Sequence, residues 1–303
     1  MQPEDLPPGS SVFRLSFIPE RWPPFQKFRW FIGPPFPTVG EPIEALMAIS
    51  AHLGKYETLA GLADRLAEEL PADQAELDRE GFTPAIRSRE FVAVSESLAC
   101  ELYAALDGLK LFLYVAYRHV PGIQRKKTSV LFKKAAEGSY GPGFPTEIQG
   151  LLAAAYASWF PKLRALRTTI THGLPGSAWL DRETGNVRYI HSGLSDGPRP
   201  FVVDDMVGHL NDLCTKVREL LDGVFSFLLT QLSGFDREVM CGVYKARIYQ
   251  RTVAVGTEIT RDSGRCLSRK WFETKPGYEC PLRGSCRAYE AAGESTPSPS
   301  AAG

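Results

Sequence analysis

The chain has 303 residues and balances 35 basic against 35 acidic side chains, so net charge by itself indicates no class of partner. Its first ten residues show no basic region followed by an apolar core, which argues against a signal peptide, and its longest apolar runs are too short to span a bilayer. We therefore expect a cytoplasmic protein without membrane contact, whose six cysteines are thiols or metal ligands rather than disulfides.

Residues 1–40 are expected to form an arm rich in proline and aromatic residues. Ten prolines and eight Phe or Trp side chains fall within residues 1–43. So many prolines disfavour a helix, and disordered tails are usually poor in aromatic residues. We expect short strands at 11–18 and 25–32 whose rings pack against the main domain.

Residues 41–235 carry the apolar periodicity of a helical bundle. Leucine-rich stripes at helical spacing within 59–70 and 98–117 predict the first two long helices. Thr83 and Pro84 are expected to supply the N-cap and first turn of the segment leading into the second of them.

The second half of this region predicts a loop, a helix, a hairpin and a last helix in that order. The loop covers 121–145 and is basic and then glycine-rich. The helix begins near Glu147, and Pro161 predicts that it kinks or restarts. Its expected buried stripe consists of Ile148, Leu152, Ala155, Trp159, Leu163, Leu166 and Ile170. A β-hairpin at 177–193 and an amphipathic helix at 204–232 follow.

The C-terminal part differs in composition from the helical region before it. Residues 236–289 are rich in β-branched residues and in lysine and arginine, and they hold four of the six cysteines. We expect a small basic β-rich module there, followed by a low-complexity, disordered tail at 290–303. The expected fold class is therefore mainly α, a helical bundle with a proline- and aromatic-rich arm, an inserted β-hairpin and a β-rich C-terminal module.

The stretch "RALRTTITHG" at 164–173 ends the helix that contains Pro161 with polar side chains. At 100° per residue, these side chains fall opposite the apolar stripe and are expected to point outward, and Gly173 is expected to end the helix. They are Arg164, Arg167, Thr168, Thr171 and His172. A purely structural explanation is that charge near a helix C-terminus compensates the dipole and keeps the exposed face in solvent.

The spacing "RTTITH" from Arg167 to His172 resembles the Arg-x4-6-His motif of the HEPN superfamily. The motif helix and its neighbours around 98–117 and from 204 also resemble the HEPN bundle, so the resemblance covers about residues 85–232 and identifies 41–235 as the HEPN-like domain. It implies a ribonuclease in which Arg167 and His172 are catalytic, with Thr168, Thr171 and Arg164 in support. The residue after the motif arginine is usually Asn, Asp or His in active members, and Thr168 departs from that pattern.

The chemistry of such a pair suits RNA cleavage, because RNA carries its own nucleophile in the 2′-hydroxyl group. Histidine exchanges protons near neutral pH, and arginine holds phosphate oxygens, so no metal or other cofactor is required for catalysis. HEPN enzymes dimerise and thereby bring two motifs into one cleft. The resemblance thus implies a homodimer that acts on RNA, as in a toxin or phage-defence effector with an antitoxin or regulatory protein as a further partner.

Two alternatives from other functional classes stay open. One is a non-catalytic HEPN-like module that binds RNA or nucleotide, which Thr168 favours. The other is a helical protein-interaction domain in which Arg167 and His172 are ordinary surface residues. The remaining histidines lie in contexts unrelated to the motif, and we assign them no role: His52, His119, His191 and His209.

Four cysteines of the C-terminal module form a candidate structural zinc site: Cys241, Cys266, Cys280 and Cys286. Four thiols can hold zinc tetrahedrally, but these are spaced by 25, 14 and 6 residues without a Cys-x2-Cys pair. The alternative is that they are separate buried thiols.

Overall fold

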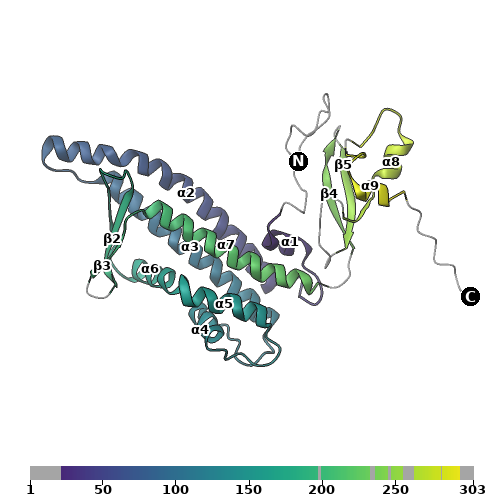
Figure 1. The fold of residues 1–303 in the computed structure, drawn as a ribbon, viewed down its shortest axis with the longest axis horizontal. Coiled ribbons are helices and arrows are strands. Elements are labelled where there is room, and N and C mark those ends of the chain that lie inside the picture. Colours follow the sequence, from purple (N-terminus) through teal and green to yellow (C-terminus); the bar gives the residue numbers. More distant parts are fainter. Residues whose placement is uncertain are drawn as a thin grey trace, which may run out of the picture. The chain divides into compact units, whose positions relative to one another are not determined.

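The computed structural model describes residues 22–196, 199–232, 236–244, 247–254, 263–280 and 282–293. The described chain is mainly α-helical and contains two small antiparallel sheets, as the sequence predicts (Figure 1). It divides into two compact units, each with its own core. We call Thr38–Val224 the bundle unit, and Met1–Pro37 together with Phe225–Gly303 the terminal unit.

The bundle unit is built around two long helices, α2 (Glu41–Glu80) and α3 (Ile86–Ala116), which lie side by side (Figure 1). Apolar side chains along α3 are almost fully buried, as the stripe predicts. The two backbones approach closely at Gly108, where a Cβ atom would lie 2.7 Å from Ile49 Cγ1 and 3.1 Å from the Ala45 carbonyl oxygen. Any larger residue at position 108 would push the two helices apart.

The start of α3 differs from the expectation that Thr83 and Pro84 cap it. The helix begins at Ile86, and Thr83 Oγ1 accepts a hydrogen bond from the Ala85 amide before the helix begins. The cap comes instead from Asp73 on α2, whose Oδ2 accepts the Ser88 amide at 2.8 Å. The sequence does not show this arrangement, because the capping carboxylate belongs to a different helix.

Three shorter helices follow α3. α4 (Thr128–Ala136) lies within the segment 121–145, which we expected to be a loop, so that expectation is wrong there. Leu131, Phe132 and Ala135 are buried at helical spacing, a pattern too short to stand out between glycines and lysines. α5 (Thr146–Ser158) and α6 (Phe160–His172) then confirm that the predicted helix restarts next to Pro161.

The helix α7 (Met206–Thr230) confirms the predicted amphipathic helix at 204–232. Within the bundle unit it lies along α2, where the Tyr56 hydroxyl donates a hydrogen bond to the Leu210 carbonyl at 2.9 Å. Burial raises the pKa of Tyr56, so this phenol stays neutral and able to donate.

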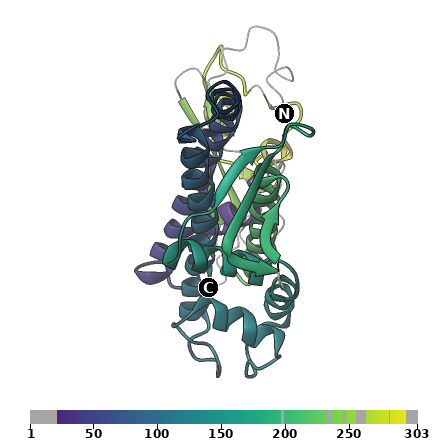
Figure 2. The same ribbon diagram turned by 90° about the vertical axis from the view of Figure 1, so that its left-hand side faces the viewer.

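A three-stranded antiparallel sheet completes the bundle unit: β1 (Ser177–Leu180), β2 (Val187–Asp196) and β3 (Arg199–Val203). The predicted hairpin is confirmed, and β3 is a strand that the sequence analysis did not predict. The sheet lies against α3 and α6 (Figure 2). It is tied to α3 by Glu96, whose Oε1 accepts the Tyr189 hydroxyl at 2.8 Å and the Gly176 amide at 2.7 Å.

In the terminal unit, α1 (Pro24–Phe31) is a helix where we expected a strand at 25–32. Pro24 occupies the first helical turn, where a missing amide proton costs nothing, so the prolines start this helix rather than prevent it. Phe25, Phe28 and Phe31 are spaced by three residues and are buried. The strand expected at 11–18 lies outside the described residues.

The rest of the terminal unit is a sheet in the order β4–β5–β6 with two short helices. The strands are β4 (Asp236–Tyr244), β5 (Arg247–Ala254) and β6 (Arg265–Cys266), which confirms strands in the predicted β-rich module. The helices are α8 (Arg269–Thr274) and α9 (Arg287–Ala291). The disordered tail predicted at 290–303 begins too early, because residues 290 and 291 belong to α9. Residues 294–303 lie outside the described part.

Candidate functional site

The motif helix α6 is shaped by its two ends. Pro161 lies in its first turn, and the apolar side chains of Phe160, Leu163 and Leu166 are buried against the rest of the bundle unit. At the other end the Gly173 amide donates to the Thr169 carbonyl at 2.7 Å, and the extended backbone of Gly173 stops the helix, as predicted. His172 is therefore the last helical residue.

Arg167 lies differently from the prediction. It is half-buried rather than fully outward, and its guanidinium carbon lies 5.3 Å from the centre of the Tyr103 ring on α3. Burial raises the pKa of Cys100, also on α3, while the charge of Arg167 and a hydrogen bond with Thr171 oppose that rise. Arg167 is long enough to fold back over α3, which a count of helical angles alone does not capture.

The other motif residues are exposed: Arg164, Thr168, Thr171 and His172. This agrees with the predicted outward face. Thr171 also donates a hydrogen bond from Oγ1 to the Arg167 carbonyl at 2.6 Å. Five residues of helix turn the chain by about 140°, so Arg167 and His172 of one chain face different directions. The helix positions both residues but does not bring them together within one chain.

His191, to which the sequence alone assigned no role, lies near α6. It is 1% exposed, it follows Val187 and Tyr189 on the buried face of β2, and its Nδ1 accepts the Gly193 amide at 3.0 Å. Among the described residues its Nε2 has no hydrogen-bond partner. Strict alternation along β2 was the signal that this histidine points inward.

Gly193 allows β2 and α6 to pack closely. A Cβ atom at Gly193 would lie 2.9 Å from Thr169 Cγ2 and 3.1 Å from His191 Cε1. The sheet therefore packs directly against the last turn of α6, and a larger residue at position 193 would displace the end that carries His172.

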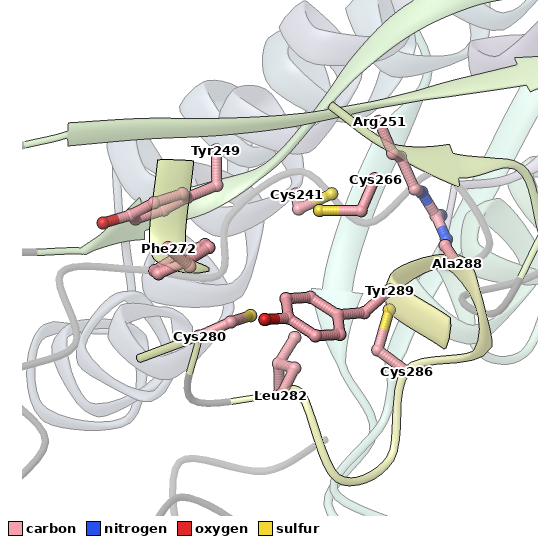
Figure 3. Close-up of a pocket in the computed structure, with 10 residues that line it drawn as sticks. All are labelled: Cys241, Tyr249, Arg251, Cys266, Phe272, Cys280, Leu282, Cys286, Ala288 and Tyr289. Carbon is pink, nitrogen blue, oxygen red and sulfur yellow. The ribbon is translucent and has the colours of Figure 1, made fainter. Parts of the chain in front are cut away.

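The four cysteines of the C-terminal module all line one cavity in the terminal unit (Figure 3). This cavity has a volume of about 40 Å³. Its other walls are Tyr249, Arg251, Phe272, Leu282, Ala288 and Tyr289. In the part of the chain that the structure describes, no three His, Cys, Asp or Glu side chains are grouped closely enough to hold a single metal ion.

Comparisons with known proteins add no relative, since no family model, curated protein or solved structure matches the chain. Among the described helices, none has both the length and the apolar character that crossing a membrane requires.

Proposed function

We propose that the chain is a metal-independent endoribonuclease of the HEPN type that works as a homodimer. The observation that carries this proposal is the exposed His172 at the end of α6, with Arg167 preceding it at the Arg-x4-His spacing. An exposed histidine at a helix terminus is accessible to a large substrate such as RNA, and its ring can exchange protons near neutral pH.

The proposed reaction is an internal transfer on the RNA backbone. The 2′-oxygen forms a bond to the adjacent phosphorus while one histidine takes the 2′-hydroxyl proton, and the bond from phosphorus to the 5′-oxygen breaks as a second histidine supplies a proton. The products are a 2′,3′-cyclic phosphate and a 5′-hydroxyl. Arg167 stabilises the negative charge that develops on the phosphate, and the Tyr103 ring restricts the guanidinium beforehand.

A second copy of the chain supplies what one copy lacks. One motif offers a single histidine, and its Arg167 and His172 face different directions, whereas a symmetric dimer places two motifs in one cleft. Leu174 is 76% exposed two residues after His172, which supplies an apolar contact for such an interface. In this proposal the enzyme acts in the cytoplasm as a toxin or phage-defence effector, restrained by an antitoxin or regulatory protein.

A second candidate function follows from Thr168. Because active HEPN members usually have Asn, Asp or His after the motif arginine, a threonine favours a module that binds RNA or nucleotide without cutting it. The exposed Thr168 would then contact the backbone of the bound strand. A helical protein-interaction domain is the remaining alternative.

The test is to incubate the purified full chain with RNA in EDTA and to determine the ends of any products. We expect fragments with 2′,3′-cyclic phosphate and 5′-hydroxyl ends. RNA binding without cleavage would support the binding module instead. Fragments with 5′-phosphate ends, or cleavage that stops in EDTA, would contradict the proposed mechanism.

A further inference from the structure

The four cysteines that line one cavity come from widely separated parts of the module. Cys241 lies on β4 and Cys266 on β6, whereas Cys280 follows α8 and Cys286 precedes α9. Figure 3 shows the two strand cysteines on one side of the cavity and the other two on the opposite side. The fold thus surrounds a single space with thiols from four segments.

A β-bulge positions the first of these thiols. In the ladder between β4 and β5, Met240 pairs with Gln250 and Gly242 pairs with Tyr249, so Cys241 is an extra residue without a partner across the ladder. Such bulges re-aim a side chain and occur often beside functional sites. Along β5, Tyr249 and Arg251 alternate onto the buried face that forms another wall of the cavity.

Backbone amides point at two of the sulfur atoms. Burial raises the pKa of Cys266, and hydrogen bonds from the Ser268 and Arg269 amides act in the opposite direction. Burial likewise raises the pKa of Cys280 to about 11, and the Leu282 amide opposes that rise. Amide donors of this kind stabilise a thiolate, and they are among the contacts that tune sulfur ligands of iron–sulfur clusters.

The cavity selects for thiolate-binding metals. Among its lining residues only cysteines are soft metal ligands, and no carboxylate or histidine is among them. Four thiolates without oxygen or imidazole ligands bind zinc or iron–sulfur clusters. Burial raises the pKa of Cys241 to about 12, and the neighbouring charge of Arg251 is the main influence that favours its thiolate.

The space between the sulfurs distinguishes these two options. A tetrahedral zinc ion has Zn–S bonds of about 2.3 Å, which requires the four sulfurs to converge to roughly 4 Å from one another. The four cysteine sulfurs around a 4Fe–4S cluster stand farther apart, because each binds a different iron atom and the inorganic core lies between them. The described residues contain no grouping fit for a single ion, yet the four thiols share a cavity of about 40 Å³.

We propose that this cavity binds a 4Fe–4S cluster through Cys241, Cys266, Cys280 and Cys286. On binding, the four thiols release four protons to solvent and form four Fe–S bonds with a core assembled from two ferrous ions, two ferric ions and four sulfide ions, so no electron is gained or lost. The cluster with its thiolates is an anion, and Arg251, which is 2% exposed, supplies a buried positive charge beside it. This inference does not rest on the proposed nuclease.

Aromatic residues form part of the wall between the site and solvent. Phe272 and Tyr289 line the cavity and also line a groove on the surface beside it, so they form the wall between the two. The Arg269 guanidinium lies 5.0 Å from the centre of the Tyr289 ring and donates a hydrogen bond to the Tyr289 carbonyl at 2.7 Å. Such an apolar shell limits solvent access, which controls the stability and potential of a bound cluster.

The test is to reconstitute the purified full chain with equal amounts of ferrous and ferric iron and with sulfide in the absence of oxygen, and then to remove unbound reagents. We expect about four iron atoms and four acid-labile sulfides per chain, with a broad visible absorption band that bleaches on reduction. The same protein incubated with zinc alone provides the competing measurement.

Variants assign the ligands. Cys280→Ser and Cys286→Ser change residues outside the strands, so we expect the sheet to survive while iron and sulfide fall to a small fraction of the parent value. Cys100→Ser removes a half-buried thiol of the bundle unit and should keep the full content. Circular dichroism checks that all three variants are folded.

Three outcomes would overturn the proposal. One is stoichiometric zinc that sulfide and iron cannot replace. Another is parent protein that binds no iron after reconstitution. The third is iron and sulfide content that stays unchanged in both Cys280→Ser and Cys286→Ser.

Discussion

The end of α6 and the four-cysteine cavity assemble their candidate side chains in opposite ways. At α6, Arg167 and His172 are five residues apart on one helix, but one lies against Tyr103 and the other is exposed. The cysteines span 46 residues, from 241 to 286, yet they line a single cavity. Proximity in sequence therefore does not make a site, and separation in sequence does not prevent one.

The difference has a consequence for what each region needs. A site that is exposed and open, like the end of α6, is completed by a second copy or by substrate. A cavity walled by aromatic and aliphatic side chains is completed by a ligand that replaces solvent around its thiols. The following changes test this contrast.

The largest effect is expected from His172→Ala. Removing a general acid or base typically costs about 10²- to 10⁴-fold in rate, and an exposed histidine leaves no cavity behind. Initial rates of RNA cleavage, with binding measured in parallel, check this. We expect cleavage to be lost and binding to be nearly unchanged.

Two variants of the same helix serve as controls for His172→Ala. Arg164→Ala removes an exposed charge outside the motif and should cost much less. Thr168→Asn installs a residue typical of active HEPN members and should raise the rate if Thr168 limits it. A His172→Ala protein that cuts RNA as fast as the parent would remove the basis of the enzyme proposal.

The helices of the core could be predicted from the sequence, because the periodic spacing of apolar residues identifies a helix locally. Of the stripe predicted for α5 and α6, all positions except the half-buried Ile170 are buried, and the restart occurs beside Pro161, since proline removes a helix amide at a known place. The helix α1 was not predicted in the same way. There, composition was weighed above the three-residue spacing of Phe25, Phe28 and Phe31.

The candidate sites were less predictable, because they depend on contacts between distant segments. The sequence singles out Arg167, but its position over Tyr103 depends on how α6 packs on α3. The sequence also singles out the four cysteines, but their spacing does not show that a bulge at Cys241 turns this residue out of the ladder. Contacts between distant segments produce no periodic pattern in the sequence.

A moderate effect is expected from Leu174→Glu. If two copies meet at the end of α6, this change buries two carboxylates in an apolar contact and should weaken dimerisation roughly 10- to 100-fold. Light scattering across a concentration series measures it, and cleavage should fall in parallel. Val39→Glu is the matched control, because Val39 is similarly exposed in the same unit but lies far along the chain from α6. A parent protein that is monomeric at micromolar concentration would contradict the dimer.

The smallest effect is expected from Asp73→Asn, which separates the stability of the bundle unit from the chemistry of the cavity. Burial alone would raise the pKa of Asp73, but hydrogen bonds from Ser88 and Arg87 outweigh it and hold this pKa below its usual value. A carboxylate with a lowered folded-state pKa stabilises the fold above its unfolded pKa of about 3.9, and the contribution is lost as pH falls below that value.

We expect Asp73→Asn to lower the free energy of unfolding by about 1 kcal/mol at neutral pH. The difference from the parent should shrink toward zero below about pH 4, as measured by urea denaturation followed through helical circular dichroism. Iron and sulfide content at neutral pH should be unaffected, since the cysteines belong to the other unit. A stability difference that is constant from pH 7 to pH 3 would show that the charge of Asp73 does not cap α3.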